Sequence, residues 1–523
     1  MPRPSAPLLI TGPVALVSGA VLALAYEPLA WFWLAPFCVA ALVLVVRQAT
    51  WRRGALLGWL FSAAHWFTLI WWMRAVGSDA YVALAGFMSL YGVLLGVGLA
   101  SVTRLRWWPL WSAVVWVAIE VLRGGWPFGG FPWARLAFAT IDTPVAPTLA
   151  WVGSNGVSLL VALMGTTLAM AAGPLVPPRG TLRATSRRQV RHLAVVGGVV
   201  GISCLPALLS IDQTDRVGEV TVAAVQGNVP GTGDDVPSHH REITASHARA
   251  TAELADQVAR GERPRPDFVV WPENSTAVDP FLDPEVHGEI LAAVDAIGVP
   301  VLVGGMVDAP DPEAVLNQGI VWDPVTGPGD RYTKHHPVPF GEYIPYRKRL
   351  DLTKNFGKLR MVPFDMMSGT RVAPLRIDGA LVGDAICFDI AYDAGLLDQV
   401  RDGAQMLVVQ TSNALFIHTH QIEQQWAISR VRAIETGRYV VVAAINGISG
   451  VIAPDGSVVD QAAIRTQSTL VDKVALVDGV TLGTFLGPWL GRLALLASVV
   501  SVVSGFLAYR RADKLAPQTE VPA

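Results

Sequence analysis

The sequence predicts a protein of two parts: a polytopic α-helical membrane domain with about eight spans, and an α/β domain placed before the last span. Only 16% of the 523 residues are charged and the mean hydropathy is +0.42, which is more apolar than an ordinary soluble enzyme. Long apolar runs fill residues 1–210 and return near the C-terminus, whereas the residues between them alternate strand-like and helix-like patterns. The net charge of −2 implies no nucleic-acid partner, and no basic tract of the kind that binds nucleic acid appears.

The apolar runs are each close to the ~20 residues that a helix needs to cross a bilayer. The first is not expected to be a cleaved signal peptide, because one arginine, Arg3, precedes it and the next run follows within a few residues. The runs cover residues 7–25, 29–46, 54–73, 79–101, 108–122, 150–172, 192–210 and 489–507.

Arginine-rich loops alternate with loops that hold few basic residues. The basic segments follow the second, fourth, sixth and last runs. By the positive-inside rule both termini are therefore cytoplasmic and the α/β domain lies outside. The expected divisions are a membrane domain with seven helices, an extracytoplasmic domain, a last membrane helix and a cytoplasmic tail, at residues 1–210, 211–487, 488–509 and 510–523.

A motif and a loop stand out in the membrane part. Gly92-x-x-x-Gly96 predicts close packing of its helix against a neighbour. The loop 124–133, Gly-Gly-Trp-Pro-Phe-Gly-Gly-Phe-Pro-Trp, holds two prolines and four glycines and is not expected to be helical. We expect it to form a structured cap close to the site of the outer domain.

The α/β domain alternates its elements over residues 211–487. This alternation predicts a single domain with a buried sheet, whose strand order periodicity does not reveal. Strand-like runs lie at 220–225, 268–271, 301–303, 320–322, 381–387, 406–410 and 439–444, and helical patterns at 239–260, 284–296, 391–402 and 419–436.

Cys387 is the candidate nucleophile. Cys38 and Cys204 lie in apolar runs, so Cys387 stands alone in the polar domain, where it serves either packing or reactivity. It ends the run 381–387, and a helix-compatible segment follows. A thiol at a helix N-terminus is favoured as the thiolate.

Two further motifs offer the groups that such a thiol needs. Glu273, in Trp271-Pro-Glu273, offers a base, and its alternative role is to cap a turn. Lys334 offers a cation in Tyr332-Thr-Lys-His-His-Pro-Val-Pro-Phe-Gly-Glu342, and its alternative is a solvated surface lysine. Glu342 is placed to fix the lysine or to shuttle a proton.

The order Glu273, Lys334, Cys387, each in its own motif, resembles the Glu-Lys-Cys triad of the nitrilase, or carbon-nitrogen hydrolase, superfamily. With apolar spans on both sides, the chain resembles the membrane branch of that superfamily, the apolipoprotein N-acyltransferase family. The most specific pieces of the likeness are Lys334-His-His-Pro-Val-Pro-Phe-Gly-Glu-Tyr-Ile-Pro345, Trp271-Pro-Glu273 and Gly130-Phe-Pro-Trp133.

The resemblance implies an α-β-β-α sandwich in a multi-pass protein of the bacterial plasma membrane. It implies that a fatty acyl chain passes from a membrane phospholipid, through a thioester on Cys387, to the α-amine of S-diacylglyceryl-cysteine in an apolipoprotein. Glu273 would be the base, and Lys334 with the backbone N–H of Phe388 would stabilise the oxyanion. The alternatives are a membrane-anchored amidase that hydrolyses a C–N bond and a transporter with a degenerate outer domain.

Some residues around the triad depart from the family pattern. Phe388 and Asp389 stand where the family commonly has Tyr-Glu. Asn413, which is expected to shape the pocket, continues into Ala-Leu-Phe-Ile where the family tends to have Asp-Ala-Trp-Phe-Gly. Neither a metal nor a cofactor is expected, because His335 and His336 lack a third ligand at a suitable spacing.

The stretch from Tyr343 to Thr370 mixes basic with apolar residues. It is either a packed loop with a solvated basic face or an arm that dips into the outer leaflet, with cations on phosphates and Met and Phe among acyl chains.

Overall fold

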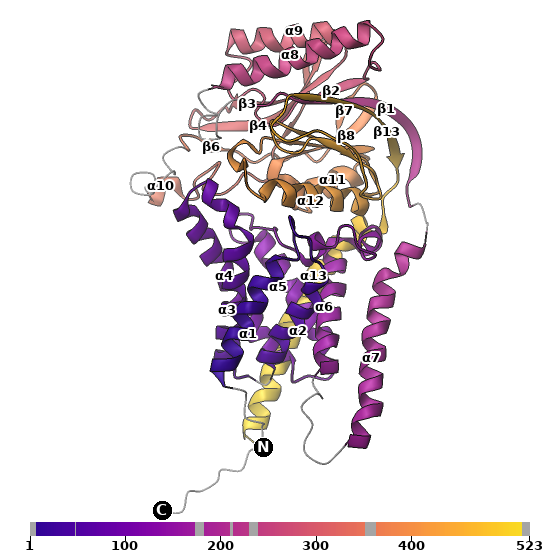
Figure 1. Ribbon diagram of the computed structural model, residues 1–523. Helices are drawn as coiled ribbons and strands as arrows, with labels where there is room; N and C mark the ends of the chain where they lie inside the picture. Colours follow the sequence, from indigo (N-terminus) through magenta and orange to yellow (C-terminus); the bar gives the residue numbers. More distant parts are fainter. Residues whose placement is uncertain are drawn as a thin grey trace, which may run out of the picture.

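A computed structural model describes residues 7–47, 49–172, 182–209, 213–229, 239–350 and 362–514. A bundle of long helices forms one half of the molecule, and an α/β domain sits on one end of that bundle (Figure 1). The chain enters the domain from α7 (Leu182–Cys204) and leaves it through α13 (Leu482–Lys514), which runs back along the bundle.

Each bundle helix overlaps one of the predicted apolar runs, although the seventh helix begins at Leu182 where the run begins at residue 192, and the last begins at Leu482 where the run begins at residue 489. Among the described residues, four segments are long and apolar enough to cross a membrane: Ser78–Val102, Ala146–Ala172, Gln189–Leu208 and Leu482–Ala508. The predicted count of eight spans is therefore not confirmed by length and composition. The helices are α1 Leu8–Ala23, α2 Leu34–Val46, α3 Trp51–Leu69, α4 Ser78–Val102, α5 Trp108–Gly125, α6 Leu149–Ala172, α7 Leu182–Cys204 and α13 Leu482–Lys514.

Small residues bring α3 and α4 into backbone contact, as Gly92-x-x-x-Gly96 predicts. A Cβ atom on Gly58 would lie 2.1 Å from the carbonyl oxygen of Gly92, and one on Gly96 would lie 2.0 Å from that of Gly54. Only glycine fits at such an approach, so this part of the sequence-based expectation is confirmed.

The α/β domain contains two sheets. The first has the order β13-β1-β2-β3-β4-β5, with β6 paired to β4, and the second has the order β12-β11-β10-β9-β8-β7. The first sheet comprises β1 Asp215–Gln226, β2 Phe268–Val270, β3 Val301–Asp308, β4 Ala314–Asp323, β5 Gly327–Thr333, β6 Asp365–Met366 and β13 Ser468–Asp478. The second comprises β7 Leu375–Ile377, β8 Ala380–Ile386, β9 Met406–Thr411, β10 Val440–Ala444, β11 Gly450–Ile452 and β12 Val458–Gln461.

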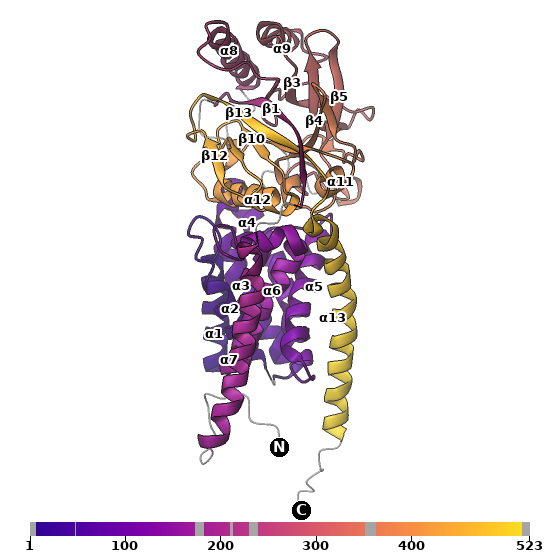
Figure 2. The ribbon, with the colours of Figure 1, turned by 90° about the vertical axis from the view of Figure 1, so that its right-hand side faces the viewer.

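Helices cover the outer faces of both sheets. Helices α8 (His240–Ala259) and α9 (Pro284–Ile297) lie on the side away from the bundle, and α11 (Leu396–Arg401) and α12 (Gln421–Thr436) lie between the second sheet and the bundle (Figures 1 and 2). The layers are thus α-β-β-α, as the family resemblance implies. Apolar side chains such as Phe268, Leu302 and Val408 fill the space between the sheets.

One continuous apolar cluster joins the domain to the bundle. It runs from Leu57 in α3 through Trp133 to Phe388 and Val431 of the α/β domain. Polar contacts reinforce it, because Gln424 Oε1 in α12 accepts hydrogen bonds from the indole of Trp133, at 2.7 Å, and from that of Trp72, at 3.0 Å. The second sheet and its helix α12 are therefore held at a fixed place on the bundle.

The helix expected over residues 391–402 is wrong in its start. Residues Cys387–Ala391 form a short 3₁₀ turn, and α11 begins only at Leu396. Gly395 has a φ of 80°, outside the helical region, and Tyr392 is drawn away to stack on His336, with ring centroids 3.8 Å apart. Cys387 therefore does not sit at the N-terminus of a long α-helix.

Candidate active site

Cys387 lies where β8, in the interior of the second sheet, ends. Its φ is 54°, a left-handed conformation that a non-glycine residue adopts only when its surroundings hold it. The carbonyl oxygen of Cys387 accepts a hydrogen bond from Gln425 Nε2 at 3.2 Å, which fixes the turn against α12. The backbone of the partly buried Cys387 is thus held in place.

Glu273 and Lys334, which the sequence motifs assign to one site, form a buried ion pair. Lys334 Nζ lies 3.0 Å from Glu273 Oε1, and the side chains are 0% and 3% exposed. Glu273 is oriented from both sides, because Asn317 Nδ2 donates to Oε1 at 2.8 Å and the backbone N–H of Ser412 donates to Oε2 at 3.1 Å. The solvated-lysine alternative is excluded by this burial.

Glu342 completes a three-membered charge cluster. Its Oε1 lies 2.6 Å from Lys334 Nζ, and its Oε2 accepts from the backbone N–H of Val338 at 2.8 Å. Burial raises the pKa of Glu342, an effect that Lys334 opposes and the charge of Glu273 reinforces. Burial alone would lower the pKa of Lys334, but Glu273 and Glu342 outweigh it and hold that pKa well above its usual value. Lys334 is therefore a permanent cation.

The pKa of the Cys387 thiol differs from the sequence-based expectation, which is a lowered pKa. Burial raises its pKa, the charge of Glu273 raises it further, and Lys334 opposes both. The predicted lowering is wrong, because desolvation and a carboxylate outweigh one cation and no long helix dipole points at the sulfur. The thiol therefore stays protonated at neutral pH.

Asp389 joins the turn Cys387–Ala391 to the residues that follow Lys334. Its Oδ2 accepts from the hydroxyl of Tyr332 at 2.9 Å and from the backbone N–H of His335 at 3.1 Å, and its Oδ1 accepts from the backbone N–H of His336 at 2.8 Å. Burial would raise the pKa of Asp389, but the hydrogen bond and charge of His336 hold it below its usual value. This carboxylate therefore joins the segment of Cys387 to the segment of Lys334.

Asn413 acts through a glutamine pair that sequence reasoning missed. Its Nδ2 donates to Gln421 Oε1 at 3.0 Å and to Gln425 Oε1 at 2.9 Å. Gln425 in turn holds the carbonyl of Cys387 and the hydroxyl of Thr411. The i, i+4 spacing of two glutamines on the buried face of α12 was the available signal.

The loop 124–133 contacts the turn Cys387–Ala391, as expected. The rings of Phe131 and Trp133 each stack on Phe388, with centroids 5.5 Å apart and planes inclined by 19°. The hydroxyl of Tyr392 donates to the carbonyl of Gly130 at 2.9 Å. Phe388 is therefore clamped between its own domain and a loop of the membrane part.

The basic stretch 343–370 is described only in part. Arg347 lies 2.7 Å from Asp365, so this cation belongs to a packed loop. On the bundle side, Phe128 contacts Phe340 and Tyr346, with centroids 6.1 and 5.8 Å apart. Lys348 and Arg349 follow Arg347 in the short helix Arg347–Leu350, and Arg349 is exposed, whereas Lys354, Lys358 and Arg360 lie outside the described residues. Within the described ranges, no three His, Cys, Asp or Glu side chains gather to hold a metal.

Comparison with known proteins finds a matching protein family for each half of the chain. Residues 221–480 match the family model of the carbon-nitrogen hydrolases, and the α/β domain is therefore a nitrilase-superfamily domain. Residues 18–167 match the N-terminal domain of apolipoprotein N-acyltransferase. The solved structure of Nit3 from Saccharomyces cerevisiae, a branch 10 member of the nitrilase superfamily, aligns over 58% of this chain and 98% of its own with a TM-score of 0.35 and 15% identity.

Whole-length relatives narrow the class further. The chain is 34% identical to the apolipoprotein N-acyltransferase of Mycolicibacterium smegmatis, over 94% of this chain and 84% of that protein. It is 32% identical to that of Ralstonia nicotianae, over 91% of this chain and 90% of that protein. The chain belongs to the apolipoprotein N-acyltransferase family, and it is an acyltransferase of lipoprotein biosynthesis.

Proposed function

We propose that this enzyme moves a fatty acyl chain from a membrane phospholipid to the N-terminal α-amine of a diacylglyceryl-modified apolipoprotein, with Cys387 as the nucleophile. One observation supports this above others. A buried lysine is held between two carboxylates, and the charges of this cluster act on the thiol of Cys387, which stands at a constrained strand end in a domain seated on apolar helices. Base, cation and thiol are the parts that covalent acyl transfer needs.

In the first half-reaction, Glu273 takes the thiol proton while the sulfur of Cys387 attacks the ester carbonyl of the phospholipid. Lys334 and the backbone N–H of Phe388 stabilise the negative charge on the carbonyl oxygen. The C–S bond forms, the C–O bond to glycerol breaks, and Glu273 returns the proton to the lysophospholipid oxygen. Glu342 keeps Lys334 in place and does not act as the base.

In the second half-reaction, the α-amine of S-diacylglyceryl-cysteine attacks the thioester of Cys387. The same donors stabilise the second oxyanion, the C–N bond forms, and the proton released by the amine restores the thiol through Glu273. The apolar stack of Phe131, Trp133 and Phe388 beside the thioester disfavours water as the acceptor. This feature favours transfer over the hydrolysis of the amidase alternative.

We infer that the chain crosses the bacterial plasma membrane eight times and that residues 211–487 lie outside, with both termini in the cytoplasm. The alternation of basic loops and the eight bundle helices support this arrangement. Trp126, Phe128 and Tyr346 expose aromatic surface near the junction with the bundle, where membrane lipids would meet the site.

The test uses purified full-length protein with phospholipid vesicles and a synthetic diacylated lipopeptide. Mass spectrometry should show N-acylated peptide and lysophospholipid in equal amounts. Cys387→Ala should give neither product, whereas Cys204→Ala, a matched control in a bundle helix, should match the wild type. Release of free fatty acid without N-acylated peptide would favour a hydrolase instead.

A further inference from the structure

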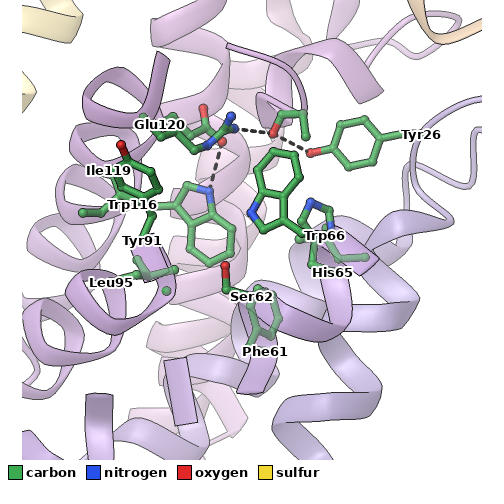
Figure 3. Close-up of a pocket in the computed structure, with 14 residues that line it drawn as sticks. Tyr26, Phe61, Ser62, His65, Trp66, Tyr91, Leu95, Trp116, Ile119 and Glu120 are labelled. Atoms are coloured by element: carbon green, nitrogen blue, oxygen red, sulfur yellow. Dashed lines mark hydrogen bonds between the residues drawn. The ribbon is translucent and has the colours of Figure 1, made fainter. Parts of the chain in front are cut away.

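Two ionisable side chains are buried inside the bundle near the end of α5. Glu120 and Arg123 are 3% and 5% exposed, one helical turn apart. Ionisable groups among membrane helices are costly, and they persist where function or fixed partners require them. Both line a cavity of about 50 Å³ together with aromatic side chains, among them Tyr26, Trp66 and Trp116 (Figure 3).

Four hydrogen bonds join this pair to the backbone of residues 131–136. Arg123 Nη1 donates to the carbonyl oxygens of Phe131, at 3.0 Å, and of Trp133, and Nη2 donates to that of Ala134 at 2.7 Å. Glu120 Oε1 accepts from the backbone N–H of Leu136 at 3.0 Å. One guanidinium and one carboxylate therefore fix the backbone of the segment 131–136.

The aromatic walls of the cavity share this task. The indole of Trp116 donates to Glu120 Oε1 at 3.1 Å, and the hydroxyl of Tyr26 donates to the carbonyl of Ala134 at 3.1 Å (Figure 3). The guanidinium of Arg123 lies 5.0 Å above the ring of Trp66, which itself contacts Phe131 at 5.8 Å. Aromatic side chains of the bundle therefore hold Glu120 and Arg123 in place, in addition to the contacts with the segment 131–136.

The fixed segment carries the two rings that stack on Phe388, the residue after the nucleophile. We propose that Glu120 and Arg123 are positioning residues for acyl transfer: from inside the membrane domain they hold the segment 131–136, so that Phe131 and Trp133 keep the Cys387–Phe388 turn in its reactive geometry. This inference rests on the proposed function, since the turn supplies both the sulfur and an oxyanion donor. Both half-reactions pass through that turn, so both depend on the pair.

The test measures the rate at which Cys387 gains an acyl chain, by intact mass, in full-length protein with saturating phospholipid. Arg123→Lys keeps the charge but cannot reach three carbonyls, so the rate should fall by about 10- to 100-fold with little change in the phospholipid KM. Ser112→Ala, a buried change on the same helix, is the control and should leave rate and KM as they are.

A double-mutant cycle separates positioning from general destabilisation. If Arg123 acts through the stack, Arg123→Lys should add less than about twofold in a Phe388→Leu background. Effects that multiply, or an Arg123→Lys protein as fast as the wild type, would overturn the inference. Failure of wild-type Cys387 to gain an acyl chain would instead overturn the proposed function.

A second pair of variants decides the matter if Arg123→Lys does not fold. Glu120→Gln keeps an oxygen for Leu136 and Trp116, so its rate should stay near that of the wild type. Glu120→Asp is one methylene too short and should be several-fold slower. Equal rates for Glu120→Asp and wild type would contradict the assignment.

Discussion

Replacing Lys334 with methionine removes the cation that separates a buried carboxylate, Glu273, from a partly buried one, Glu342. Lys334 Nζ lies 3.0 Å from Glu273 and 2.6 Å from Glu342, and the lysine is fully buried. Removal of one member of a buried ion pair costs about 3–5 kcal/mol, because the remaining charge loses its partner. For a domain of this size that loss lowers the melting temperature by roughly 6–20 °C.

The assay is thermal unfolding of the full-length protein in detergent, with acyl-enzyme formation measured in parallel. Lys473→Met is the matched control, because this lysine is 69% exposed and 3.3 Å from Glu219, and its loss should cost less than about 1 kcal/mol. Adding Glu342→Gln to Lys334→Met should recover part of the stability and none of the activity. A Lys334→Met protein that melts and acylates like the wild type would refute this account of the cluster.

Three other predictions concern the sheets, the cluster and the bundle. Burial of Asp384, helped by the charge of Asp389, raises the pKa of that carboxyl group well above its usual value. The unfolded chain therefore releases a proton above pH ~4 that the folded chain keeps, so the free energy of unfolding falls by up to about 1.4 kcal/mol for each pH unit above that value. Asp384→Asn should be more stable than the wild type at pH 8 and should lose that advantage toward pH 4. A gain in stability that does not depend on pH would contradict the assignment. Glu342→Gln should slow turnover and still allow acylation of Cys387, while Glu273→Gln should abolish acylation in the same mass assay; the opposite pattern would reverse the choice of base. Gly58→Ala puts a Cβ 2.1 Å from a carbonyl of α4 and should lower the melting temperature, unlike Gly86→Ala, whose Cβ meets open space; equal melting temperatures would argue against the close packing.

The sequence predicts the parts of this protein that depend on local pattern. Apolar length locates the bundle helices, and Gly92 with Gly96 locates the contact between α3 and α4. The strand-end motifs identify Glu273 and Lys334, which the fold then brings to 3.0 Å. These features can be predicted because each depends on a motif of residues close together in the chain.

Long-range contacts escape such reasoning. Strand β13 pairs with β1 across some 250 residues, and Gln424 meets Trp72 from another domain. The pKa of Cys387 depends on burial, which the motif around it does not express. The helix expected after Cys387 fails because Gly395 is left-handed and Tyr392 packs on His336. In each case tertiary contacts override a local preference.

The central claim is that Cys387 carries the acyl chain, and intact-protein mass spectrometry tests it most directly. Full-length protein given phospholipid and no acceptor should gain the mass of one fatty acyl chain, located at Cys387 by peptide mapping. Neutral hydroxylamine should remove this mass, and a diacylated lipopeptide should discharge it into N-acylated product. A Cys387→Ala protein that still performs full N-acyl transfer would contradict the account.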